Sequence, residues 1–311
     1  GVFWAGSDDG LVHVSKDGGD SWTDITPGEL PEWSLISMIE PSAHSAGTAY
    51  MAATRYKLGD NSPLLFKTED YGEQWKVING NLPEDDFTRC IREDPVKPGM
   101  LYAGTETKLY VSFDDGNSWW ELKGNGSVGK GSLPVVPIYD IAIKEDDMIV
   151  ATHGRSFWIL DDLTQLRQVP EIEGIDSPHI LQPRDTIRIT APFRNRKAAE
   201  GKNYQLSLGA AVTYTEDKNT YGEVERSFLD AGQNPPAGVL LNYFLPEKTD
   251  DEVSLTFLDH SGVEIVTYSN NVEDARISED EIGQLSIASN IGMNRFIWDM
   301  RYPPANSVPG D

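Results

Sequence analysis

Short stretches in which apolar and polar residues alternate recur through the first half of the chain, and they predict short β-strands. The segments FWAGSDDGLVHV, AYMAATRYKLGDNSPLLF and LYAGTETKLYV each read as strand, turn and strand. A polar turn follows each of them, and then a short segment that opens on tryptophan: WTDIT, WKVING or WWELKG. The stretches SLISMIEP, FTRCIREDP and IYDIAIKED open the following units. The pattern predicts four short strands in a repeat of roughly 45 residues, as in a β-propeller blade.

One motif, Ser/Thr-x-Asp-x-Gly-x-x-Trp, lies between the third and fourth predicted strands of three units. Its copies are Ser15, Asp17, Gly19 and Trp22; Thr68, Asp70, Gly72 and Trp75; and Ser112, Asp114, Gly116 and Trp119. The carboxylate and the hydroxyl can accept bonds from turn amides, and glycine permits a positive φ. We expect each tryptophan to pack its ring into the sheet behind. A fourth unit ends in Asp161-Asp162, without the glycine or the tryptophan.

These motif residues favour a structural role over a catalytic or calcium-binding one. A calcium loop needs more oxygen ligands and a terminal glutamate. A repeated motif also favours structure, because a protein rarely repeats an active site in every unit.

A different pattern begins after residue 168. The strands TIRITAP, GVLLNYFLP, EVSLTFLD, GVEIVTYS and NRFIWDMRY predict an antiparallel β-sandwich, with a hairpin turn at 259–262. Phe296, Trp298, Met300 and Tyr302 are expected to line one strand. Residues 194–235 are polar and predict a long surface excursion, and Ser278 with Glu281 marks one short helix. The fold class is therefore all-β.

The sequence predicts two domains from its 311 residues. Residues 1–168 form a partial propeller of about four blades, the first incomplete; 169–184 form a linker; and 185–311 form an Ig-like β-sandwich that is cut short. The chain opens in the middle of a strand, with GVFWAG. We expect it to be a piece of a longer protein whose upstream blades close the ring.

Charge and composition exclude some partners. The formal net charge of −24 repels phosphate backbones and anionic lipids, so we expect neither nucleic acid nor membrane insertion. No apolar run approaches the roughly 20 residues of a membrane span. Cys90 is the only cysteine and is expected to be a buried apolar residue. The histidines show no metal-ligand spacing, and the sequence predicts no metal and no cofactor.

The three motif copies resemble the Asp-boxes, or BNR repeats, of sialidases and sortilin-type propellers. The strings IREDPVKPGMLYAGTE, VATHGRSFWILDDLTQLRQ and NRFIWDMRYP resemble bacterial BNR-repeat glycosyl hydrolases and sortilin N-terminal-domain proteins over nearly the whole chain. The resemblance implies propeller blades followed by an Ig-like sandwich, similar to the module of the flagellar hook-assembly protein FlgD. It also implies an exported protein, extracellular or periplasmic. No Arg-Ile-Pro string of the sialidases occurs, so no catalytic residue carries over.

The predicted strand order places a candidate ligand site on the face opposite the boxes. The loops between second and third strands, and the starts of the inner strands, meet on that face. The ligand-binding candidates are Arg55, Tyr56, Arg89, Glu106, Asp140, His153 and Arg155, beside Thr88 and Tyr139. Such a mixture suits an anionic or sugar-like ligand, because arginine forks bind carboxylates. The alternative is that Arg55, Arg89, Arg92 and Arg155 form structural ion pairs with Glu93, Asp94, Glu106 and Asp140.

Two functions remain open at this stage. The first is a non-catalytic propeller that binds a protein, peptide or carbohydrate at the mouth of its channel. The second is a sialidase-like glycoside hydrolase whose catalytic carboxylates lie mostly in the upstream blades. Two carboxylates facing one pocket, roughly 5 to 10 Å apart, would favour the hydrolase. A mouth filled by arginine–glutamate pairs would favour the binding protein.

Overall fold

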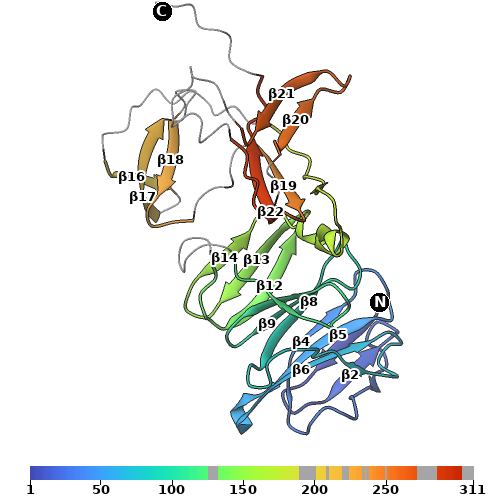
Figure 1. The fold of residues 1–311 in the computed structure, drawn as a ribbon. Coiled ribbons are helices and arrows are strands. Elements are labelled where there is room, and N and C mark those ends of the chain that lie inside the picture. The colour runs from blue at the N-terminus through green and yellow to red at the C-terminus, as the bar shows by residue number, and fades with distance from the viewer. Residues whose placement is uncertain are drawn as a thin grey trace, which may run out of the picture. The chain divides into compact units, whose positions relative to one another are not determined.

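The computed structural model describes residues 1–124, 132–188, 201–207, 210–218, 224–232, 235, 238–248, 251–271 and 286–302. The chain divides into two compact units, Gly1–Pro170 and Glu171–Asp311, and each is considered by itself. Antiparallel strands form nearly all of the regular structure in the described ranges (Figure 1). None of the helices in these ranges is both long and apolar enough to span a lipid bilayer.

The described residues of the first unit form four antiparallel sheets in chain order. Sheet 1 has β1 (Phe3–Gly6), β2 (Val12–Ser15) and β3 (Thr23–Asp24). Sheet 2 has β4 (Leu35–Pro41), β5 (Ala49–Arg55), β6 (Asp60–Thr68) and β7 (Lys76–Val77), with a 3-10 turn, η1 (Tyr56–Leu58). Sheet 3 has β8 (Thr88–Glu93), β9 (Leu101–Thr105), β10 (Leu109–Ser112) and β11 (Trp120–Glu121). Sheet 4 has β12 (Ile138–Lys144), β13 (Asp147–Thr152) and β14 (Phe157–Leu160).

Each strand of these sheets pairs with the next strand along the chain, so every sheet is a simple meander. The motif follows β2, β6 and β10, which makes β1, β2 and β3 the counterparts of the second, third and fourth strands of the later sheets. Sheet 4 holds the counterparts of the first three strands. Consecutive four-stranded meanders that stack on one another make a β-propeller-like fold.

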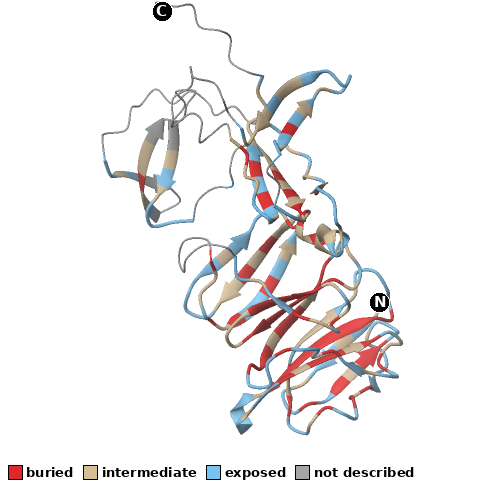
Figure 2. Ribbon diagram, in the orientation of Figure 1, coloured by how far each residue is buried: buried red, intermediate tan, exposed pale blue. Residues whose placement is uncertain are grey.

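Apolar side chains fill the space between neighbouring sheets. Val12 and Val14 of sheet 1 pack with Met51 and Phe66 of sheet 2. Further clusters join sheet 2 to sheet 3 and sheet 3 to sheet 4 in the same way. The middle strands β5 and β9 are buried along nearly their whole length (Figure 2), as expected for strands covered on both faces. This burial explains why AYMAAT and LYAGT lack a polar alternation.

The inner strands β4, β8 and β12 lie next to one another and share one irregularity. A register shift near the start of each strand leaves one residue without a partner on the neighbouring strand: Ser37, Arg89 or Tyr139. Such a bulge bends the strand and turns a side chain away from the pleat. Three bulges at equivalent positions therefore present three side chains at one end of the sheets.

The second unit contains three further antiparallel sheets among its described residues. The strand β19 (Val239–Leu245) pairs with β15 (His179–Ile180) and β22 (Gly292–Trp298), while β20 (Ser254–Leu258) pairs with β21 (Glu264–Ser269). Leu241, Tyr243, Leu255 and Phe296 are buried in a common core. The third sheet is β16 (Asn203–Ser207), β17 (Ala210–Lys218) and β18 (Val224–Phe228).

The second unit differs in part from the sequence expectations. The polar segment 194–235, predicted as a partly ordered surface excursion, contains the sheet β16–β18, in which Tyr204, Tyr214 and Phe228 lie among polar residues. Residues 186–188, expected to begin a strand, are irregular, and 189–192 lie outside the described residues. The last strand ends at Trp298, so Tyr302 does not continue it. Ser278 and Glu281 lie outside the described residues.

The segment expected as a linker at 169–184 carries structure in part. A 3-10 helix, η2 (Leu166–Ile172), follows sheet 4, and β15 lies at the end of the segment. The hairpin turn at Asp259–Gly262 has the expected form, since the amide of Gly262 donates to the carbonyl of Asp259 at 2.9 Å.

Candidate functional site

Each motif copy ties its turn together with the same three hydrogen bonds. In the third copy, Ser112 Oγ donates to Asp114 Oδ1 at 2.9 Å and accepts from the amide of Gly116 at 2.9 Å, while the amide of Ser118 donates to Asp114 Oδ1 at 2.8 Å. The copies at Ser15 and at Thr68 have the same bonds. The hydroxyl residue is buried in every copy. The hydroxyl and the carboxylate of each copy are thus used within the turn.

The turn also lowers the pKa of each motif carboxyl. Bonds from the hydroxyl and amide of Ser21 hold the pKa of Asp17 well below its ordinary range, and the amide of Gln74 lowers that of Asp70. Burial would raise the pKa of Asp114, but the amide of Ser118 and the hydroxyl of Ser112 outweigh it. These carboxylates stay ionised at neutral pH as hydrogen-bond acceptors, which is the opposite of what a general acid requires.

Two of the motif tryptophans join neighbouring sheets. Trp75 Nε1 donates to the carbonyl of Ile25 at 2.7 Å, and Trp119 Nε1 donates to the carbonyl of Ile78 at 2.9 Å. Each acceptor lies three residues after the tryptophan of the preceding copy. The expected packing of the tryptophan ring into the sheet behind was wrong for Trp22, which is 46% exposed because no described sheet precedes sheet 1.

The opposite end of the sheets, which we call the rim face, carries most of the sequence-derived candidates. Here the connections β5–β6, β9–β10 and β13–β14 meet the starts of β8 and β12. The amide of Glu106 donates to the carbonyl of Phe87, and the amide of His153 donates to that of Pro137. Side chains of sheets 2, 3 and 4 therefore meet on one surface.

A row of planar side chains forms the centre of the rim face. Tyr56 stacks on Phe87 with ring centroids 4.8 Å apart. The Arg89 guanidinium carbon lies 4.9 Å from the Phe87 ring centroid and 4.3 Å from that of Tyr139. Tyr139 in turn lies 4.8 Å from the imidazole of His153. With Glu106, these residues form what we call the rim cluster: Tyr56, Phe87, Arg89, Glu106, Tyr139 and His153.

Arg89 is held on its edge as well as on its faces. Its Nε and Nη2 lie 2.6 and 2.5 Å from Glu106 Oε2. The two charges compensate each other, and the rings of Phe87 and Tyr139 provide favourable cation–π contacts. The arginine is thereby fixed by neighbours on several sides and is largely buried.

The other predicted candidates lie on the same face but outside this cluster. Arg55 pairs with Asp60 of its own hairpin at 2.8 Å. Asp140 accepts from Arg92 at 2.9 Å, and Arg92 also contacts Glu40 at 2.5 Å, so this ion chain crosses β4, β8 and β12. The side chain of Arg155 is exposed.

The prediction missed Phe87 on this face, and it missed Glu40, which lies near the far end of β4 and contacts Arg92. Phe87 precedes an alternating strand, and its sequence position is that of a core residue. In the structure it is buried, and its ring also stacks on the partly exposed Tyr56. Glu40 lies in the apolar segment SLISMIEP, which gives no sign that its carboxylate meets Arg92. Thr88, which was considered with the candidates, donates its hydroxyl to the carbonyl of Ala53 at 3.0 Å and serves the sheet.

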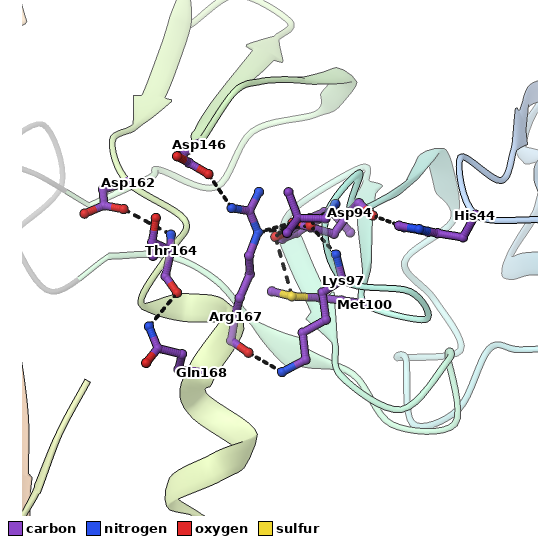
Figure 3. Close-up of polar contacts among 11 residues, drawn as sticks. His44, Asp94, Lys97, Met100, Asp146, Asp162, Thr164, Arg167 and Gln168 are labelled. Carbon is purple, nitrogen blue, oxygen red and sulfur yellow. Dashed lines mark hydrogen bonds and ion pairs between the residues drawn. The ribbon is translucent and has the colours of Figure 1, made fainter. Parts of the chain in front are cut away.

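A separate buried ion cluster lies around Arg167 (Figure 3). Arg167 Nε is 3.0 Å from Asp94 Oδ1, and its Nη1 is 2.5 Å from Asp146 Oδ1. The carbonyl of Arg167 accepts from Lys97, and His44 Nε2 bonds the carbonyl of Asp94 at 2.8 Å. The side chains of Arg167 and Asp94 are 8% and 0% exposed. This cluster fastens η2 to sheet 3.

Cys90 and the arrangement of potential metal ligands complete the description of the first unit's chemistry. The thiol of Cys90 is buried, and burial raises its pKa to about 12, so it is not a nucleophile at neutral pH. Within the described ranges no group of three or more His, Cys, Asp or Glu side chains is arranged to hold a metal ion.

No protein-family model matches the chain, and no curated protein matches it. Among solved structures, it is similar to YCF48 bound to D1 peptide, with 15% identity and a TM-score of 0.38 over 51% of this chain and 47% of that one. It is also similar to the GH74 xyloglucanase from Xanthomonas campestris, with 14% identity and a TM-score of 0.41 over 80% and 38%. YCF48 from Cyanidioschyzon merolae matches with 14% identity and a TM-score of 0.39 over 78% and 63%. The chain spans less than half the length of the first two structures.

Proposed function

We propose that this chain is part of an exported bacterial propeller of the BNR, or Asp-box, and sortilin-like kind. In this proposal the rim cluster lies at the mouth of the propeller channel and binds a protein, peptide or carbohydrate, while the Asp-boxes hold the blades. The second unit is an Ig-like module that follows the blades. The protein would act outside the cytoplasm, in the extracellular space or the periplasm.

The pairing of the carboxylates on the rim face carries this proposal. Glu106 is bound by Arg89, Asp140 by Arg92 and Asp60 by Arg55. A glycosidase needs one carboxyl that donates a proton and a second that attacks or activates water. Carboxylates that arginines of the protein already hold are not free to contact a glycosidic bond, whereas partly exposed tyrosines beside a fixed arginine are typical of binding surfaces.

Glu40 is the strongest observation in favour of a hydrolase. Burial raises its pKa, although Arg92 opposes the shift, and a raised carboxyl pKa is a property of general acids. Its carboxylate is nevertheless held by Arg92 at 2.5 Å. The geometry therefore supports binding better than hydrolysis.

The test compares wild type with Tyr139→Ala on an array of glycans and in selection from a random peptide library. We expect ligands that bind wild type and lose at least about tenfold in affinity with Tyr139→Ala, the effect of one aromatic anchor. Tyr204→Ala, which removes an exposed tyrosine of the second unit, serves as the matched control.

A panel of aryl glycosides, including a sialoside, tests the alternative. Turnover on any of them that collapses in Glu40→Gln or Glu106→Gln, with the fold intact, would replace the binding proposal by a hydrolase. Binding that is equally strong in wild type and Tyr139→Ala would place the ligand elsewhere on the molecule.

A further inference from the structure

We propose that the rim face binds a neutral, chain-like carbohydrate across several sheets, and not an acidic sugar. This inference rests on the proposed function and narrows it to one class of ligand. It follows from two observations: the arginines at the centre of the face are already paired, and exposed aromatic side chains recur from sheet to sheet.

The central arginines already hold carboxylates of the protein. Arg89 directs Nε and Nη2 to one oxygen of Glu106, and the rings of Phe87 and Tyr139 lie against its guanidinium. Arg92 is shared between Glu40 and Asp140. Binding a carboxylate here would break an existing ion pair and leave a carboxylate of the protein without its partner, which is costly. The net charge of −24 adds a general repulsion of anions.

The aromatic side chains, in contrast, are partly exposed, although the Tyr139 ring already has the Arg89 guanidinium at 4.3 Å and the His153 imidazole at 4.8 Å. Tyr56 and Tyr139 are 37% and 46% exposed, at the junctions of sheets 2 and 3 and of sheets 3 and 4. Trp33, in the connection from sheet 1 to sheet 2, is 67% exposed. Its backbone nitrogen lies beside Gly10 of the β1–β2 connection, which places it on the same end of the sheets. One exposed aromatic ring thus accompanies each junction.

Trp33 also has a strained backbone. Its φ of 62° is in the left-handed region, which a bulky residue enters at an energetic cost. An exposed, strained aromatic residue contributes little to the core of the protein. Strain of this kind is retained most often where it serves a site.

The chemistry of a pyranose fits this arrangement. One side of the pyranose ring presents C–H groups that pack on an aromatic face. The edge of the sugar carries hydroxyls that donate and accept hydrogen bonds. The half-exposed Glu106 and the imidazole of His153 lie next to the rings of the rim cluster and can bond such hydroxyls. Local charges are balanced within this cluster, so a neutral partner leaves no ion unpaired.

The experiment measures binding of the whole chain to cellohexaose, xylohexaose, mannohexaose and, as the acidic probe, hexagalacturonate. Titration calorimetry gives the affinities, and tryptophan fluorescence reports contact with Trp33. We expect at least one neutral hexasaccharide to bind about tenfold more tightly than its disaccharide. Its affinity should change less than about twofold between about 50 and about 500 mM NaCl, because no ion pair forms.

Variants locate the site. Tyr139→Ala and Trp33→Ala should each weaken the binding about tenfold, and Trp33→Phe should abolish the fluorescence change while retaining most of the affinity. Tyr204→Ala should leave the affinity unchanged. Heat denaturation of every variant verifies that the fold is intact.

The other outcomes separate this inference from the proposed function. Suppose that only hexagalacturonate binds, and that its binding is sensitive to salt and lost in Arg155→Ala. This outcome would overturn the inference of a neutral ligand but would leave the proposed binding function in place. Peptide binding that depends on Tyr139, without binding of any hexasaccharide, would do the same. Absence of binding to all sugars and peptides would overturn both.

Discussion

At the scale of single residues, the glycine of the second and of the third box is required for two separate reasons. Gly116 has a φ of +82°, which other residues adopt at a cost, and a methyl group placed on it would lie 2.7 Å from Cβ of Ile78. Gly72 stands in the same relation to Ile25, where the distance would be 2.4 Å to Cδ1. The glycine therefore shapes the turn of its own sheet and admits the aliphatic residue of the preceding one.

These two roles can be separated by substitution. Gly116→Ala should lower the free energy of unfolding about 1–3 kcal/mol more than Gly154→Ala, because overpacking is added to backbone strain. Gly154 has a φ of +93° and open space around its missing side chain, so it is the matched control. Urea denaturation measures both. Equal losses would mean that Ile78 moves aside freely and that only the turn conformation matters.

The residue scale also shows what the sequence could and could not predict about the site. Local spacing predicted that Tyr56, Arg89, Glu106 and His153 lie at one end of the sheets, because loops of a repeat return to the same face. It did not identify Phe87 as their neighbour, since an apolar residue before a strand is equally typical of a core. The partner of Asp94 was also missed: Arg167 is distant in sequence and lies in a segment without repeat pattern.

At the scale of elements, the strand predictions were most accurate where turns and alternation agree, as in β8 to β10 and in β19 to β21. They failed in β16 to β18, where charged residues within the strands hide the alternation. The bulges in β4, β8 and β12 could not be predicted from alternation, because a bulge adds one residue without changing residue type. It is these bulges that place Arg89 and Tyr139 on the rim face.

The tryptophan bond between sheets is an element-scale feature that can be tested. Trp119→Phe keeps most of the ring but removes the Nε1 donor, leaving the buried carbonyl of Ile78 without this partner. We expect it to destabilise the protein by about 1–2 kcal/mol. Trp22→Phe should change the stability by less than about 0.5 kcal/mol, because that side chain is exposed.

Guanidinium denaturation of the two variants provides the comparison. Neither substitution should alter binding at the rim face, which lies at the other end of the sheets. Similar losses in both variants would indicate that the ring contacts, and not the hydrogen bond to the preceding sheet, account for the effect.

At the scale of the whole first unit, the junctions between sheets are of two kinds. Sheets 1, 2 and 3 are joined by tryptophan bonds and packed aliphatic residues. Sheet 4 carries Asp161-Asp162 in place of a complete box. Its attachment includes the ion pairs of Arg92 with Asp140 and of Arg167 with Asp146.

The ion cluster around Arg167 predicts that substituting this residue, which is distant in sequence from Asp94, lowers the stability strongly. Arg167→Met should lower the stability of the first unit by about 3–5 kcal/mol, because Asp94 would remain buried without its counter-charge. The partly exposed pair in Arg55→Met should cost no more than about 1 kcal/mol. Hydrogen exchange should show the largest loss of protection around Asp94 and β12–β13. An Arg167→Met variant as stable as Arg55→Met would contradict this role.

The bond from each tryptophan to the preceding sheet has a consequence for how such a protein changes over evolutionary time. The donor meets a backbone carbonyl, which every residue type supplies, and the glycine needs only an aliphatic neighbour. A duplicated or deleted repeat therefore recreates a working junction without compensating substitutions elsewhere. Because the tryptophan junctions between sheets use the same contacts, recombination can change the number of sheets. The loops that each sheet contributes to the rim face can meanwhile diverge independently.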